Sequence, residues 1–193
     1  MEPSMKDRRV LVTGAAGFIG YHVAGRLLAA GAVVHGIDNF NDYYDVSLKE
    51  RRLAQLEVHR DFAMARVDLA DSAAVKREVA LYQPDVIIHL GAQAGVRYSL
   101  ANPRAYASSN IDGFLSILEA ARAHPVRHLV YASSSSVYGA NTKIPFAETD
   151  PVDRPVSLYS ATKRSNELMA RTYAHLFDIP CSGLRLFTVY GPW

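Results

Sequence analysis

A tyrosine and a lysine lie four residues apart in the segment Leu158–Phe177, whose pattern is helical: Tyr159 and Lys163. Residues at this spacing share one face of a helix, so the phenol and the ammonium can meet. A free phenol has a pKa of about 10 and is a poor base at neutral pH, but a neighbouring positive charge favours the phenolate. The pair could therefore move a proton, although the same spacing also arises by chance in many helices.

Four serines, Ser133 to Ser136, end a predicted strand 23 to 26 residues before Tyr159. A hydroxyl at such a strand end can hydrogen-bond a reacting oxygen and pass a proton. The same residues could also form a simple turn. We interpret them as catalytic candidates because the chain also carries the glycine-rich turn described next.

Three glycines at intervals of three, Gly14, Gly17 and Gly20, stand between a predicted strand and a predicted helix. They permit a tight turn, a close approach of backbone to a pyrophosphate, and close packing of helix on strand. Asp38, at the end of the second strand, can accept hydrogen bonds from both hydroxyls of an adenine ribose, and its charge disfavours a 2′-phosphate. The pattern predicts binding of NAD rather than NADP. The alternative is a structural turn with Asp38 as a loop cap.

Six short apolar strands alternate with helices along the chain. The predicted strands are Arg9–Thr13, Val33–Ile37, Met64–Val67, Asp85–Leu90, Arg127–Ala132 and Cys181–Phe187. The predicted helices follow the glycine turn, begin at Ser47 and at Asp71 or Ser72, and cover Pro103 to about Ala123 and Leu158–Phe177. This order predicts an α/β fold, a doubly wound parallel Rossmann-like sheet, with residues 1–193 as one NAD-binding domain.

The composition of the 193 residues excludes few classes of protein by itself. The formal net charge is +2, and the basic clusters Lys6–Arg9 and Lys49–Arg52 are short and mixed with acids. We interpret both clusters as solvated surface and expect no nucleic-acid partner. A single cysteine, Cys181, allows no intramolecular disulfide and is interpreted as a buried strand residue. No apolar run is long enough to span a membrane, so the expectation is a cytoplasmic protein. We also expect no metal site.

Several longer motifs resemble a known family. They are DNFNDYYDVSLK, AQAGVRYSL, SNIDGFLSILEA, SSSSVYG, LYSATKRSNELMA and LRLFTVYGPW. Together with the TGxxGxxG turn, they resemble the extended short-chain dehydrogenase/reductases, in particular the NAD-dependent epimerase/dehydratase branch. Within that branch they are most similar to the UDP-glucuronate 4-epimerases.

The resemblance implies roles for individual residues. It places the catalytic serine at Ser134, beside Tyr159 and Lys163, with Lys163 also holding the nicotinamide ribose. The implied cofactor-binding residues are Gly14, Gly17, Phe18, Ile19, Gly20, Asp38, Asn39, Asp68, Leu69, Ala92, Asn110, Tyr159 and Lys163. The implied substrate-binding residues are Arg97, Ser135, Ser136 and Thr188. Alone, Asp68 and Leu69 could be a strand-end acid and a core residue, and Arg97 a surface arginine.

The implied reaction is C4 inversion of a UDP-sugar through a 4-keto sugar. Dehydratases and decarboxylases of the branch carry acidic residues before Val-Tyr-Gly, where this chain has Ser135 and Ser136. That difference favours epimerisation, with UDP-glucuronate converted to UDP-galacturonate. The alternatives are another epimerase or dehydratase of the branch, or an NAD-binding protein without activity.

The resemblance also implies a longer polypeptide and a homodimer. Family members continue beyond YGPW with a region that binds uracil and diphosphate, so that lobe is expected to be largely absent here. The helices at about 103–123 and 158–177 correspond to those that form the family's dimer interface. We expect Ile111, Leu115, Leu118 and Ala121 on one face of the first helix. Apolar residues also lie beyond one stripe in both helices, for example Phe114 with Ile117 and Leu168 with Met169, so one face can pack on the sheet and the other on a partner. The alternative is that all these residues belong to the core of the domain.

Overall fold

A computed structural model describes residues 5–193. A parallel sheet of six strands forms its centre, in the order β3-β2-β1-β4-β5-β6. The strands are β1 (Arg9–Thr13), β2 (Val33–Asp38), β3 (Phe62–Arg66), β4 (Val86–His89), β5 (His128–Ser134) and β6 (Cys181–Leu186). The chain reverses direction across the sheet between β1 and β4, which places the ligand crevice of a doubly wound sheet at their carboxyl ends. The predicted fold class is confirmed.

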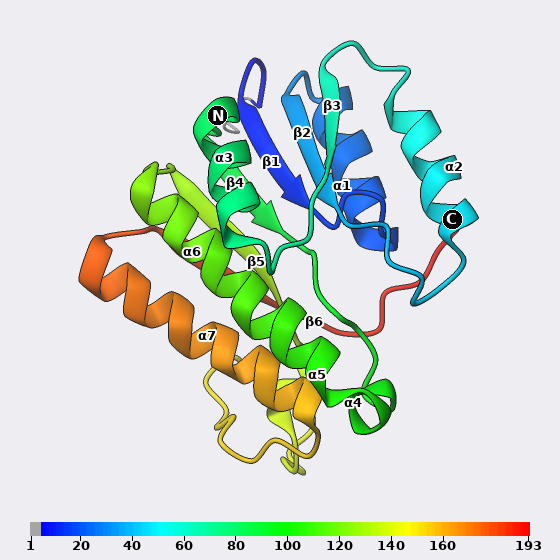
Figure 1. The fold of residues 1–193 in the computed structure, drawn as a ribbon. Helices are drawn as coiled ribbons and strands as arrows, with labels where there is room; N and C mark the ends of the chain where they lie inside the picture. Colours follow the sequence, from blue (N-terminus) through cyan, green and yellow to red (C-terminus); the bar gives the residue numbers. More distant parts are fainter. Residues whose placement is uncertain (1–4) are drawn as a thin grey trace.

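The helices form a layer on each face of the sheet (Figure 1). They are α1 (Phe18–Ala29), α2 (Val46–Leu56), α3 (Ser72–Tyr82), α4 (Tyr98–Ala101), α5 (Pro103–Tyr106), α6 (Gly113–Ala123) and α7 (Leu158–Phe177). Alternate residues of β1 serve the two layers: Leu11 packs with α3, α6 and α7, whereas Val10 and Val12 pack with α1 and α2. This alternation follows from the period of two along a strand.

The helix predicted over Pro103 to Ala123 is interrupted. A π-helical turn, Ala107–Asp112, separates α5 from α6. Such a turn inserts a residue and rotates the face that follows it. Phe114 and Ile117 are therefore fully buried in the core, while Leu115 is 39% exposed. Leu115 thus lies apart from Leu118 and Ala121, which are buried, although one common face was expected. Phe114 and Ile117 are core residues, as in the alternative to a partner-facing role.

In the basic cluster Lys49–Arg52, which was expected to be solvated surface, Arg51 is exposed but Lys49 and Arg52 are buried. Lys49 is 4% exposed and Arg52 is 3% exposed, and both lie on the face of α2 that also buries Leu53 and Leu56. The spacing of these four residues repeats every three or four positions, so the helix turns two cations inward with two leucines. Cys181 is only half-buried, because β6 forms an edge of the sheet in the described part of the chain.

None of the helices formed by residues 5–193 is both long and apolar enough to cross a membrane.

Candidate active site at the carboxyl edge of the sheet

The glycine turn after β1 has the backbone geometry that its residue types require. Gly14 has a φ of +67°, a left-handed conformation that a side chain disfavours. At Gly20, in the first turn of α1, an added Cβ would collide with the carbonyl oxygen of Gly14. Gly17 precedes the first residue of α1 and makes no side-chain cap. The turn therefore leaves a bare helix N-terminus, with backbone N–H groups and the positive end of the helix dipole, for an anionic group.

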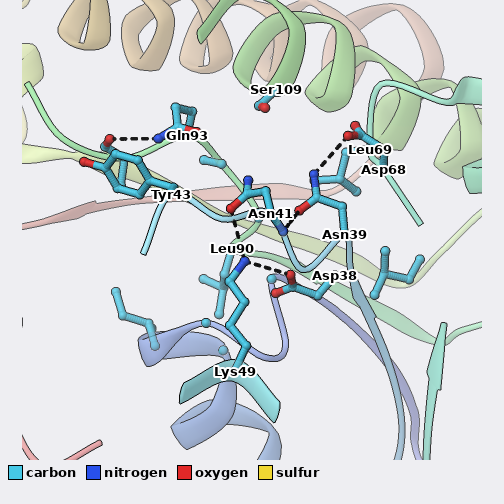
Figure 2. A pocket seen from close by; sticks show the side chains of 18 of the residues that line it. Asp38, Asn39, Asn41, Tyr43, Lys49, Asp68, Leu69, Leu90, Gln93 and Ser109 are labelled. Carbon is cyan, nitrogen blue, oxygen red and sulfur yellow. Dashed lines mark hydrogen bonds and ion pairs between the residues drawn. The ribbon is translucent and has the colours of Figure 1, made fainter. Parts of the chain in front are cut away.

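A cavity of about 310 Å³ opens beside this turn (Figure 2). Ten of the residues predicted to bind a cofactor line it: Gly14, Gly17, Phe18, Ile19, Gly20, Asp38, Asn39, Asp68, Leu69 and Ala92. Three strand ends contribute to this lining, because Asp38 ends β2, Asp68 follows β3 and Ala92 follows β4. The Asn39 amide donates to Asp68 Oδ2 at 2.9 Å and joins two of these ends.

Sequence reasoning missed several residues of the same cavity. They include Asn41, Tyr43, Tyr44, Lys49, Leu90, Gln93 and Ser109. Lys49 is the most consequential, since its ammonium lies 3.1 Å from Asp38 Oδ1 and 3.2 Å from Asn41 Oδ1. Figure 2 shows Lys49 reaching from α2 toward Asp38. The signal that could have found it is the period of α2, which places Lys49 in register with Leu53 and Leu56.

Ser134 and Tyr159 are brought together at the end of β5. Ser134 is 9% exposed, and its side chain is near enough to the Tyr159 hydroxyl to lower the pKa of that phenol. The neighbouring serine turns the other way, because the Ser133 hydroxyl donates to Glu167 at 2.7 Å. Ser136 donates to Ser134 Oγ at 2.9 Å through its hydroxyl and at 3.2 Å through its backbone N–H. The geometry thus selects Ser134 from the four serines as the partner of Tyr159.

Lys163 is buried one turn further along α7. Its ammonium donates to the carbonyl oxygen of Ala132 at 2.9 Å, and burial lowers its pKa to about 8. Burial also raises the pKa of Tyr159, and the hydrogen bond with Ser134 opposes that rise. That the Lys163 ammonium and a positive nicotinamide together favour the phenolate stays a prediction, and in this structure the pKa of the phenol is raised. The physical reason is that loss of water around the phenol outweighs the hydrogen bond that stabilises the phenolate.

Asn110 organises the site from within the π-helical turn. Its side chain accepts from the Gln93 backbone N–H at 2.8 Å and donates to the Gln93 carbonyl and to Thr162 Oγ1, both at 3.1 Å. Asn166 donates to the Asn110 carbonyl at 2.6 Å. Asn110 does not line the cavity, and the side-chain bonds just described are to protein groups. It joins the segment after β4 to α7 between Tyr159 and Lys163, which is a positioning role.

The predicted substrate residues lie outside the cavity. Ser135 and Ser136 are half-buried in a short 3-10 turn, Ser135–Tyr138, directly after Ser134. Arg97 and Thr188 are exposed. Arg97 precedes α4, a short helix that sequence reasoning missed, and Thr188 follows β6. The structure therefore places two of the four predicted substrate residues next to Ser134 and leaves two at the surface.

Comparisons with known proteins agree with this geometry. A probable UDP-glucuronate 4-epimerase of Rhizobium meliloti is 56% identical over 185 residues, which are 96% of this chain and 54% of that protein. UDP-glucuronate 4-epimerase 3 of Arabidopsis thaliana is 52% identical over 95% of this chain and 43% of that protein. This chain thus spans about half the length of these relatives.

Solved structures with the same fold include two epimerases. The UDP-glucuronic acid 4-epimerase of Bacillus cereus, in complex with UDP-glucuronic acid and NAD, has a TM-score of 0.88 and 35% identity, over 95% of this chain and 58% of that one. The UDP-glucose 4-epimerase of Thermotoga maritima, with UDP-glucose, has a TM-score of 0.84 and 32% identity, over 95% and 57%. The family model for the NAD dependent epimerase/dehydratase family matches residues 10–193. The chain belongs to the NAD dependent epimerase/dehydratase family.

Proposed function

We propose that this chain is the NAD-binding and proton-transferring part of a UDP-sugar 4-epimerase that acts on UDP-glucuronate. One observation carries the proposal: Ser134 at the end of β5, with Tyr159 near it and buried Lys163 one turn further along α7, lies at the same sheet edge as the cavity of the glycine turn. The relatives and solved neighbours named above, whose names include UDP-glucuronate and NAD, support it.

The residues of the cavity fit an adenine dinucleotide. The glycine turn offers a diphosphate the bare N-terminus of α1, and Asp38 stands at the end of β2 as an acceptor for ribose hydroxyls. Asp68 and Leu69, after the neighbouring strand β3, also line the cavity and offer an adenine a polar and an apolar group. When bound, NAD supplies a hydride acceptor and donor. This part of the proposal needs only residues 1–193.

The chain's own groups would handle the proton. Tyr159 takes the proton of a sugar hydroxyl as that carbon is oxidised, and Ser134 holds the same oxygen through its hydrogen bond. Ser134 opposes the rise in the pKa of the Tyr159 phenol that burial causes. The proton returns from Tyr159 when the 4-keto sugar is reduced on its other face. Ser135 and Ser136 supply no carboxyl group, which favours epimerisation over elimination of water.

Product analysis tests the reaction. A version extended to the length of the relatives should convert UDP-glucuronate to UDP-galacturonate without net consumption of NAD, as followed by proton NMR. Inversion of UDP-glucose or UDP-N-acetylglucosamine in preference to UDP-glucuronate would reassign the substrate. A 4-keto-6-deoxy product would show a dehydratase, and no turnover with any UDP-sugar would contradict the proposed activity.

We further propose a homodimer that forms through α6 and α7. These helices lie side by side on the outer surface in Figure 1 and expose Leu115, Leu168 and Leu176 by 39%, 50% and 60%. Leu168 was predicted for this face, whereas Met169 packs against the core. Light scattering at micromolar concentration should give the mass of two chains, and Leu168→Glu should reduce it to one. A monomeric mass for the unchanged protein would refute the dimer.

A further inference from the structure

The cavity of the glycine turn contains a buried ion pair whose cation has no assigned role. Lys49 and Asp38 are 4% and 7% exposed, and their side chains meet at 3.1 Å. Among the described residues that line the cavity, Lys49 is the only cation. Its ammonium also lies 5.2 Å from the centre of the Tyr44 ring, which helps to hold it in place. A desolvated cation of this kind interacts strongly with whichever anion stands next to it.

Asp38 uses its two carboxylate oxygens differently. Oδ1 accepts from Lys49 and, at 2.9 Å, from the backbone N–H of Phe40. No hydrogen bond from the described part of the chain reaches Oδ2. Oδ2 is also not among the fully buried atoms that lack a partner, so it is accessible. Asp38 therefore keeps one oxygen for a ligand in the cavity and uses the other to hold the ammonium.

We infer that Lys49 is a second determinant of cofactor choice, an inference that rests on the proposed binding of an adenine dinucleotide. In the unchanged protein, the Lys49 ammonium pairs with Asp38 and holds its carboxylate in place. That carboxylate accepts hydrogen bonds from the hydroxyls of a ribose without a 2′-phosphate. When residue 38 carries no charge, the same ammonium becomes the partner of a phosphate monoester on that ribose. Asp38 thus excludes NADP in two ways: it repels the 2′-phosphate, and it occupies the cation that would bind it.

A simpler account, in which Asp38 acts by repulsion alone, makes a different prediction. Loss of the charge at position 38 would then make the affinities for the two ribose forms similar, and Lys49 would have no part in the result. If Lys49 participates, the preference inverts. The two accounts are separated by combining a neutral residue at position 38 with changes at position 49.

The experiment measures binding, not activity. Adenosine 5′-monophosphate, adenosine 2′,5′-bisphosphate, NAD and NADP are titrated calorimetrically into residues 1–193 and into Asp38→Asn, Asp38→Asn with Lys49→Met, and Asp38→Asn with Lys49→Arg. The amide introduced by Asp38→Asn retains an oxygen for the Phe40 N–H. Thermal melting checks that each variant folds. If Asp38→Asn does not fold, Asp38→Ser replaces it as the neutral variant.

The unchanged protein should prefer the ligands without the 2′-phosphate. Asp38→Asn should prefer the bisphosphate and NADP by about tenfold or more, the effect of one hydrogen bond to a charged group. Adding Lys49→Met should abolish that preference and adding Lys49→Arg should retain it, and added salt should weaken it. An equally strong preference in the double variant with Lys49→Met, or no inversion in Asp38→Asn, would overturn the inference. Failure of the unchanged protein to bind any of the four ligands would instead contradict the proposed function.

Discussion

The two halves of the candidate site differ in how completely the described chain builds them. On the glycine-turn side, ten predicted residues line one cavity, and its charged groups Asp38 and Lys49 are buried and paired. On the serine side, Ser134 and Tyr159 meet, but Arg97 and Thr188 are exposed. The first half is formed by the ends of adjacent, hydrogen-bonded strands. Register between neighbours fixes such positions, whereas loop residues far along the chain need further contacts to fix them.

Replacement of the phenol proposed to transfer the proton should give the largest effect and should separate the two halves most clearly. In a version with the length of the relatives, Tyr159→Phe should lower turnover by about 10² to 10⁴-fold, the contribution of one positioned proton-transfer group. The affinity of residues 1–193 for NAD should change little, because Tyr159 does not line the cavity. Ser134→Ala should lower turnover less. Near-normal turnover of Tyr159→Phe would eliminate the proposed proton transfer.

Lys163 connects the halves through stability and pH. Its pKa falls from 10.5 unfolded to about 8 folded, so between these values the unfolded chain binds the extra proton and a rise in pH favours folding. Relative to Lys163→Met, the unchanged protein should gain on the order of 3 kcal/mol as pH rises through this window. Chemical denaturation of both proteins at several pH values measures the difference in their unfolding free energies. Tyrosines also titrate in this range, but their contributions cancel because both proteins contain them. A constant difference would show that the ammonium is not desolvated.

Replacement of Asn110 tests whether this residue connects the two halves of the site. Asn110→Ala removes the acceptor of the Gln93 N–H and should cost about 1 to 3 kcal/mol of unfolding free energy, the penalty of a buried unpaired group. It should also weaken NAD binding and turnover together, since it joins the cavity wall to α7. Asn166→Ala, which leaves the Asn110 side chain intact, is the matched control for the π-helical turn. Loss of stability without any change in binding would restrict Asn110 to a structural role.

Arg97→Ala should have the smallest effect on the folded chain. Arg97 is exposed, so the unfolding free energy should change by no more than about 0.5 kcal/mol, and NAD affinity should stay the same. If Arg97 contacts the carboxylate of UDP-glucuronate, the KM for that sugar should rise while the KM for UDP-glucose does not. Equal changes in both KM values would remove Arg97 from substrate recognition.

The sequence alone determined the parts of the molecule in which local spacing implies position. Gly14, Gly17 and Gly20 at intervals of three predict the turn, because only glycine tolerates the left-handed backbone and the close approach of α1. Strand and helix alternation predicts the parallel sheet. The place of Asp38 at the end of the second strand predicts that it lines the cavity. The helical spacing of four brings Tyr159 and Lys163 onto one side of α7.

Tertiary structure decided what depends on packing between distant segments. The π-helical turn exchanged Leu115 for Phe114 and Ile117 in the core, because the inserted residue rotates the helix face. Burial raised the pKa of Tyr159, and Lys163 turned to a strand carbonyl. The same kind of packing placed Lys49 against Asp38, since Lys49 of α2 meets the end of β2 only in the folded chain. A charge in a sequence carries no sign of whether it meets water or a buried partner, and that depends on the neighbours supplied by the fold.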